Sequence, residues 1–194
     1  MPRRRLAFSL ATLLAFPGIA SADDDPNGRL ARPGEPYFVM GGGGHVGLFR
    51  FRDWHGKGTQ GGVELGGGQA VLTHAGIFHS GFVHGSQVRI FGSHGVALSD
   101  YYEGLAGFRV GPFVPEVRAG VSGLTLDVYR GGLSAELFSP RASAALLVQL
   151  GPHASVGAVG YGEYLWRWFG PDVRIYGAGL ELRVEGPRYF LDLP

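Results

Sequence analysis

The sequence predicts an all-β chain that forms an eight-stranded antiparallel up-and-down transmembrane β-barrel. Residues 158–168 and 176–184 alternate with period two, which is the spacing of a strand with two different faces. One face is apolar or aromatic, and the other carries Glu163, Arg167, Glu181 and Arg183. Glycine makes up 35 of the 194 residues and is interleaved with Val, Leu, Phe and Tyr. In a narrow barrel, glycine makes room for long charged side chains that point inward.

The first 22 residues predict a secretory signal peptide. Three arginines at positions 3–5 precede an apolar stretch at 6–19 and a small-residue cleavage site, Ala20-Ser21-Ala22. A membrane anchor is the weaker alternative, because the stretch is shorter than the ~20 residues of a spanning helix and contains Pro17. Cleavage after Ala22 leaves a periplasmic leader at 23–35, a β-barrel at 36–186 and a C-terminal tail at 187–194.

The composition excludes several classes of protein. Three of the 17 basic residues lie in the signal peptide, so 14 remain against 16 acidic residues, a formal charge of −2. This balance argues against a nucleic-acid partner, which requires a basic face. The chain has no cysteine and therefore no disulfide framework. Since no further apolar run is long enough for a helical span, membrane insertion must use strands.

Eight strand-like segments follow Glu35. We place them at 36–51, 60–73, 77–92, 98–110, 113–126, 140–150, 154–168 and 173–186. The connections near 74–76, 111–112 and 151–153 are short, and those between them are longer. Outer-membrane barrels show this asymmetry, with short periplasmic turns and longer outside loops. The longest connection, 123–140, is the expected site of any extracellular recognition, and a further hairpin within it is the ten-stranded alternative.

Charged residues fall on one parity within nearly every strand, so we expect them in the barrel interior. Buried charges are tolerated when they are paired, and arginine offers a planar fork for two carboxylate bonds. We therefore expect an interior closed by ion pairs and not an open pore. The expected set is Glu64, Arg89, Glu103, Arg109, Glu116, Arg118, Glu163, Arg167, Glu181 and Arg183.

Aromatic residues gather near the predicted strand ends, as in the interfacial belts of membrane barrels. Core aromatics of a soluble sandwich are the alternative interpretation. At the turn end we place Phe38, Phe82, Phe108 and Phe113. The expected loop-end belt is Trp54, Tyr101, Tyr102, Trp166, Trp168 and Tyr176.

These features together resemble the small outer-membrane β-barrels of Gram-negative bacteria, the class that includes the transmembrane domain of OmpA. The resemblance covers about Tyr37–Glu185 and includes Leu105–Gly120, LAGFRVGPFVPEVRAG. It implies localisation in the cell outer membrane, with outer-membrane lipid and the barrel assembly machinery as partners. Such barrels finish on a strand with an aromatic last residue. Here Tyr189 and Phe190, beyond the expected last strand, are the candidates for that signal.

The seven histidines of the chain are the first candidates for metal ligands. The spacing between them matches no known ligand pattern, so we expect no metal and no other cofactor. The run Gly41–Gly44 lacks the Gly-Lys-Ser/Thr ending of a phosphate loop. The seven histidines are His45, His55, His74, His79, His84, His94 and His153.

His84 and Ser86 form the pair that most suggests catalysis. Residues i and i+2 of a strand share a face, and a Ser–His pair with a nearby acid can hydrolyse an ester. Outer-membrane lipid A deacylases place histidine and serine at this spacing, and Asp100 or Glu103 is the candidate acid here. The surrounding motif of that family is absent, so an outer-membrane lipid hydrolase stays the second alternative.

The function expected from the sequence is that of an integral outer-membrane barrel without catalysis. It would serve a structural or surface-interaction role, with an extracellular ligand that the sequence does not specify. The first alternative is a soluble secreted β-sandwich or a lipocalin-like binding protein, which would be extracted without detergent.

Overall fold

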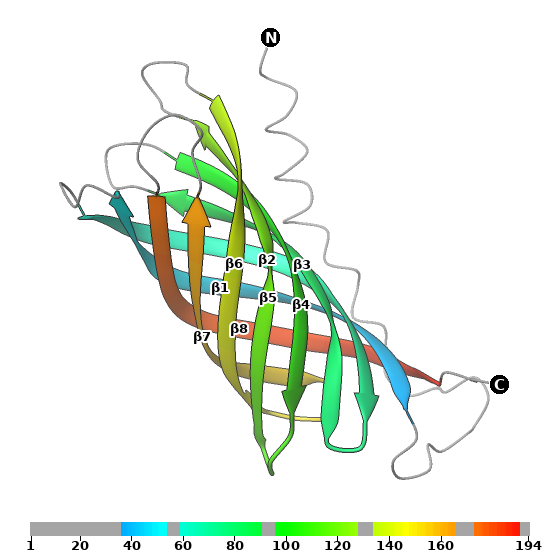
Figure 1. Ribbon diagram of the computed structural model, residues 1–194. Coiled ribbons are helices and arrows are strands. Elements are labelled where there is room, and N and C mark those ends of the chain that lie inside the picture. The colour runs from blue at the N-terminus through cyan, green and yellow to red at the C-terminus, as the bar shows by residue number, and fades with distance from the viewer. Residues whose placement is uncertain (1–35, 54–58, 91–95, 128–133, 166–172, 191–194) are drawn as a thin grey trace.

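The chain forms one closed β-barrel (Figure 1). The computed structural model describes residues 36–53, 59–90, 96–127, 134–165 and 173–190. Each strand pairs antiparallel with the next, and β1 pairs with β8 to close the barrel. The strands are β1 (Tyr37–Asp53), β2 (Thr59–Ala75), β3 (Phe78–Ile90), β4 (Val96–Phe108), β5 (Phe113–Asp127), β6 (Ser134–Gln149), β7 (Ala154–Leu165) and β8 (Val173–Phe190).

The prediction of an eight-stranded antiparallel barrel is therefore confirmed, and the two-sheet sandwich is wrong. Strands β5 and β6 pair with each other up to Asp127 and Ser134, so the ten-stranded alternative finds no support in the described residues. The signal peptide and the leader lie outside those residues. No helix in the described part of the chain is long and apolar enough to cross a membrane.

Three tight turns lie at one end of the barrel, which we call the turn end. Gly76 and Gly111 have φ angles of 61° and 58°, and each follows the last paired residue of a strand or bridge. A positive φ at the first central residue is what two-residue hairpin turns require, and glycine adopts it without strain. In the third turn, the amide of Leu150 donates to the carbonyl of Ala154 over 2.9 Å. The remaining connections, 54–58, 91–95, 128–133 and 166–172, are outside the described residues and join strands at the opposite end, the loop end.

The barrel closes between its first and last strands with one irregularity. The β1–β8 register runs from Asp53 opposite Val173 to Gly41 opposite Glu185, shifts at a bulge, and resumes with Val39 opposite Arg188. Strand β8 therefore continues to Phe190, four residues beyond the expected end at 186. A bulge lets a strand bend and twist without losing its partner, which accommodates the segment that we expected to form a tail.

The two faces of the barrel wall have opposite chemistry. Alternate residues of each strand point outward, and most outward positions in the described segments carry apolar side chains, such as Leu48, which is 68% exposed. The inward positions include many charged and hydroxyl-bearing residues that are almost fully buried. Glycines on the inner face leave room for aromatic rings. A Cβ on Gly85 would collide with the ring of Tyr101, and a Cβ on Gly177 with the ring of Tyr161.

Candidate functional site

The interior nearer the loop end is centred on Arg89 of β3. Its two terminal nitrogens donate to the two carboxylate oxygens of Glu163 on β7, over 3.0 and 2.8 Å. The Nε of Arg89 lies 3.4 Å from a carboxylate oxygen of Glu64 on β2. The hydroxyl of Tyr161 on β7 donates to Glu64 and accepts from Arg89. Strands on opposite sides of the barrel are thus joined through its centre.

Arg141 of β6 belongs to the same group of ion pairs, which forms a first layer nearer the loop end. Its Nη1 donates to Glu163, and its Nε donates to Glu103 of β4 over 3.1 Å. Its guanidinium carbon also lies 4.4 Å from the ring centre of Tyr101 and 4.0 Å from that of Tyr161. A cation near aromatic ring faces gains electrostatic stabilisation, which is stronger away from water. The arginine is therefore held by both carboxylates and rings.

A second layer lies nearer the turn end. Arg118 of β5 forms two hydrogen bonds to Glu181 of β8, over 2.8 and 3.0 Å. Arg183 of β8 forms two to Glu116 of β5, over 2.5 and 2.8 Å. Glu116 also accepts a hydrogen bond of 2.9 Å with Nε2 of His79. Carboxylates on β5 and β8 are therefore bound by arginines of both strands, in a reciprocal arrangement.

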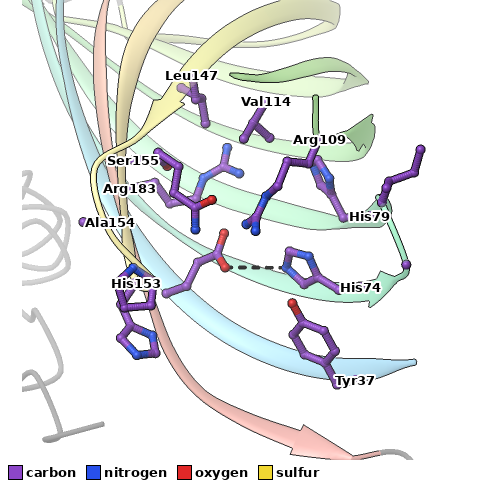
Figure 2. A pocket seen from close by; sticks show the side chains of 15 residues that line it. Tyr37, His74, His79, Arg109, Val114, Leu147, His153, Ala154, Ser155 and Arg183 are labelled. Carbon is purple, nitrogen blue, oxygen red and sulfur yellow. Dashed lines mark ion pairs between the residues drawn. The ribbon is translucent and has the colours of Figure 1, made fainter. Parts of the chain in front are cut away.

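The turn end of the interior contains a small polar space (Figure 2). The ring of Tyr37 stacks on His74 at 4.9 Å, and His74 stacks on His79 at 5.5 Å. Nε2 of His74 lies 3.5 Å from the carboxylate of Glu185, as the dashed line in Figure 2 marks. Arg109 also lines this space. Rings and charges therefore narrow this mouth of the barrel.

The structure brings together eight of the ten residues expected inside the barrel. They are Glu64, Arg89, Glu103, Glu116, Arg118, Glu163, Glu181 and Arg183. Arg109 lines the turn-end space, which Arg183 of the second layer also lines, and Arg167 is outside the described residues. Sequence reasoning missed Arg141, although it shares its parity with inward residues of β6. Its inward neighbours, Ser143 and Ala145, are small and carry no charge signal.

The expected loop-end belt is only partly placed on the outer face. Tyr102 and Tyr176 point outward and are more than half exposed. The expectation for Tyr101 is wrong, since its side chain is 6% exposed and lies in the interior beside Arg141. Neighbouring residues of a strand point to opposite faces, so Tyr101 and Tyr102 cannot share one belt. Trp54, Trp166 and Trp168 are outside the described residues.

His84 and Ser86 are on the outer face, without the contacts of a catalytic triad. The hydroxyl of Ser86 donates to a carboxylate oxygen of Asp100 over 2.5 Å. The ring of His84 instead stacks on Tyr102, with ring centres 4.3 Å apart. A serine nucleophile needs a base that accepts its proton and is itself oriented by a third group. Here the two residues make separate contacts from β3 to β4, Ser86 with Asp100 and His84 with Tyr102, and these contacts do not form a triad.

Two spaces inside the barrel are too small for a cofactor or drug-sized ligand. The turn-end space has a volume of about 40 Å³, and a second space near His45 and Arg118 has about 20 Å³. Sites for small molecules usually have volumes of ~300–1,000 Å³, so these two hold no more than a few waters. Among the described residues, no three His, Asp or Glu side chains are grouped to hold a metal ion.

An apolar outer wall around an ion-paired interior, with tight turns at one end, defines the architecture of small membrane-spanning barrels. The crystal structure of Neisserial surface protein A has this fold, with a TM-score of 0.58, 13% identity, and coverage of 76% of this chain and 96% of that chain. At this identity the similarity concerns the fold.

Two further solved structures match with lower scores. The N-terminal beta-barrel domain of OprF from Pseudomonas aeruginosa has a TM-score of 0.45 and 12% identity, with 73% of this chain and 96% of that chain covered. Ail, the attachment invasion locus protein of Yersinia pestis, has a TM-score of 0.44 and 15% identity, with 77% and 99% covered. The sequence matches no protein-family model and none of the curated proteins.

Proposed function

We propose that this chain is an integral β-barrel of the outer membrane with a structural or surface-interaction role. The proposal includes secretion through a cleaved signal peptide at residues 1–22, and an interior that is closed to solutes. It also includes the absence of catalysis.

The observation that carries the proposal is the distribution of polarity across the barrel wall. A soluble barrel buries apolar side chains inside and exposes polar ones, and a lipocalin-like carrier also needs an apolar cavity. Here Leu48, Leu180 and Phe82 point outward, whereas Arg89 and Glu163 are fully buried inside. Only an apolar solvent makes such an outer face favourable, and a closed barrel leaves no unpaired strand edge within it.

Closure of the interior is supported by the two ion-pair layers. Each layer joins strands that are not neighbours, as in the pairs Arg89–Glu163 and Arg118–Glu181. Removing one partner of a buried pair leaves an uncompensated charge and costs about 3–5 kcal/mol, so each charge of a layer is held by its partners. A filled interior favours a scaffold that presents its loop end to the outside over a solute channel.

The proposed partners follow from the same geometry. Outer-membrane lipid contacts the apolar wall, and the barrel assembly machinery inserts the chain, for which the aromatic end of β8 at Phe190 is the candidate signal. An extracellular ligand would contact the connections at the loop end. The Ser86 hydroxyl donates to the Asp100 carboxylate while His84 stacks on Tyr102, so the described contacts do not form the Ser–His–acid relay of a hydrolase, which supports the absence of hydrolysis.

Membrane fractionation followed by gel electrophoresis of unboiled and boiled samples tests the proposal. A closed barrel resists detergent until it is heated, because its backbone hydrogen bonds are paired between strands. We expect the protein in the outer-membrane fraction, with a mobility change on boiling. Release into the soluble periplasmic fraction with no change on boiling would contradict the proposal and favour the soluble binding protein.

A further inference from the structure

One guanidinium in the turn-end space is not used by the ion pairs inside the barrel. Arg109 is half-buried, and Figure 2 shows its side chain extending into the space. Among the described residues, no carboxylate lies within ion-pair distance of it. Arg183, which also lines the space, is already bound to Glu116 and Glu181. Arg109 is therefore the cation at this mouth that can still bind a carboxylate.

The groups around Arg109 also favour an anion. Gln149 of β6 and His153, in the turn before β7, line the same space and can donate hydrogen bonds into it. Among the described lining residues Glu185 is the one carboxylate, and it lies 3.5 Å from Nε2 of His74. Glu185 thus has a partner of its own. Cations and donors outnumber acids where Arg109 ends.

The size of the space limits what can enter it. Its volume is about 40 Å³, far below the ~300–1,000 Å³ of sites for small molecules. A buried water needs ~10–15 Å³ on the same scale, so a few waters fit. The two oxygens of one carboxylate can take the place of such waters, and a guanidinium fork binds both of them. The space therefore fits the end of one acidic side chain and is too small for a sugar or a nucleotide.

The chain itself has acidic side chains within reach of this mouth. Strand β1 begins at Tyr37, whose ring lines the space, so the leader at residues 23–35 joins the barrel here. Its first three residues are Asp23, Asp24 and Asp25. Asp25 precedes Tyr37 by 37 − 25 = 12 positions, which an extended chain spans with up to about 40 Å. That is about eight times the ~4.8 Å between neighbouring strands, so the acidic run can reach any part of the mouth.

We propose that the acidic start of the leader, residues 23–25, binds at the turn-end space, with one aspartate on Arg109. The inference rests on the proposed cleavage after Ala22, which places this run at the start of the mature chain. A short tether gives a local concentration in the millimolar range, so even a weak contact is well populated. The bound leader covers the periplasmic mouth of a barrel that the two ion-pair layers close from inside.

Introduced cysteines test the contact directly, because the chain has no cysteine of its own. The mature protein, from Asp23 onward, is folded in detergent micelles with Asn27→Cys, which keeps all three aspartates of the leader. Gln149→Cys supplies the second thiol at the space. Leu150→Cys is the matched control, since Leu150 is the next residue but is 65% exposed and does not line the space. We expect mild oxidation to form the disulfide with position 149 about tenfold faster than with position 150.

Protease cleavage of the leader tests the role of Arg109. Trypsin cuts after Arg29, whereas Pro33 protects the bond after Arg32. A bound leader is cut slowly, because cleavage follows the population of the released form. We expect Arg109→Glu to speed this cut about tenfold, and Arg109→Gln serves if the first variant fails to fold. Arg50→Glu, a charge reversal at an exposed position near the loop end, should keep the wild-type rate.

A double-mutant comparison shows whether Arg109 and the aspartates act through one contact. Replacing all three aspartates with asparagine should speed the cut as much as Arg109→Glu does. Adding Arg109→Glu to that variant should change nothing further, since both changes remove the same interaction. Raising the salt concentration to ~1 M should speed the cut in wild type relative to these variants, because it screens the charges.

Equal disulfide formation at positions 149 and 150 would overturn the inference, and so would equal cleavage of wild type and Arg109→Glu. A disulfide between two molecules instead of within one would assign the space to the leader of a second copy and overturn the intramolecular contact. Each sample is first tested for the heat-dependent mobility change. A wild-type protein without that change contradicts the proposed function, whereas a heat-modifiable barrel with a rapidly cut leader contradicts this inference alone.

Discussion

Arg89 and Glu163 form a bidentate ion pair across the barrel interior, with hydrogen bonds of 2.8 and 3.0 Å between β3 and β7. Both side chains have 0% exposure, so neither charge is screened by water. Two parallel hydrogen bonds also fix the orientation of the guanidinium plane. The pair therefore sets the separation of two strands that have no backbone contact with each other.

Replacing Arg89 with alanine should lower the free energy of unfolding by about 3–5 kcal/mol, because Glu163 and Glu64 keep buried charges without their main cation. The double variant Arg89→Met, Glu163→Leu should lose less, since neither charge of the pair is left and Arg141 keeps Glu103 as a carboxylate partner. Urea titration of the folded barrel in lipid vesicles measures both. A double variant less stable than Arg89→Ala would contradict this account of the ion pair.

Gly177→Ala should destabilise the barrel by about 1–3 kcal/mol, because its Cβ would collide with the buried ring of Tyr161. Gly162→Ala is the matched control on the other face, where a Cβ would lie 3.6 Å from the Tyr176 ring in ordinary contact. The same urea titration compares them. Equal stability of the two variants would show that the Tyr161 ring moves freely, contrary to its packing here.

Leu180→Arg should lower stability in a bilayer by about 2–4 kcal/mol, since this outward side chain lies near the middle of β8. Tyr176→Arg, closer to the loop end, should lower it by only ~0–1 kcal/mol if that position reaches the interface. Unfolding in vesicles of defined thickness gives both values. Identical costs at the two depths would show that the outer wall is not in contact with lipid.

Wild-type protein in planar bilayers should show no stepwise conductance, because both ion-pair layers fill the interior. The variant Arg89→Ala, Arg183→Ala removes one large cation from each layer and should admit small ions. Its current should be cation-selective, since the glutamates of both layers remain. Steady conduction by wild type would show that the layers open and would contradict closure.

Wild type and Ser86→Ala should release fatty acid from an acyl-ester lipid at the same background rate. The Ser86 hydroxyl donates to Asp100, and His84 is stacked on Tyr102 instead of accepting that proton. If wild type released fatty acid much faster than Ser86→Ala, and both barrels showed the heat-dependent mobility change, the lipid-hydrolase alternative would be favoured. His84→Ala separates the role of the ring from that of the hydroxyl.

The alternation of residues was enough to predict the number of strands and most of the interior charges. Sequence did not reveal which charges meet, because contacts such as Arg118–Glu181 cross the barrel and depend on the stagger of all eight strands. The sequence carries no charge signal around Arg141, because its inward neighbours are small, and it suggests one belt for Tyr101 and Tyr102 although adjacent residues of a strand point to opposite faces. The sequence predicts the end of the last strand at 186, whereas a bulge in the β1–β8 pairing carries β8 on to Phe190.

The pairing of Tyr37 with Phe190 has a kinetic consequence. This residue pair joins the first residue of β1 to the last residue of β8. It is therefore the pair with the largest sequence separation in the barrel. Contacts of such high sequence separation slow folding, and any chain that lacks β8 exposes two unpaired edges. Folding therefore cannot be completed strand by strand during synthesis. An intermediate with open edges needs protection from aggregation until the last strand arrives.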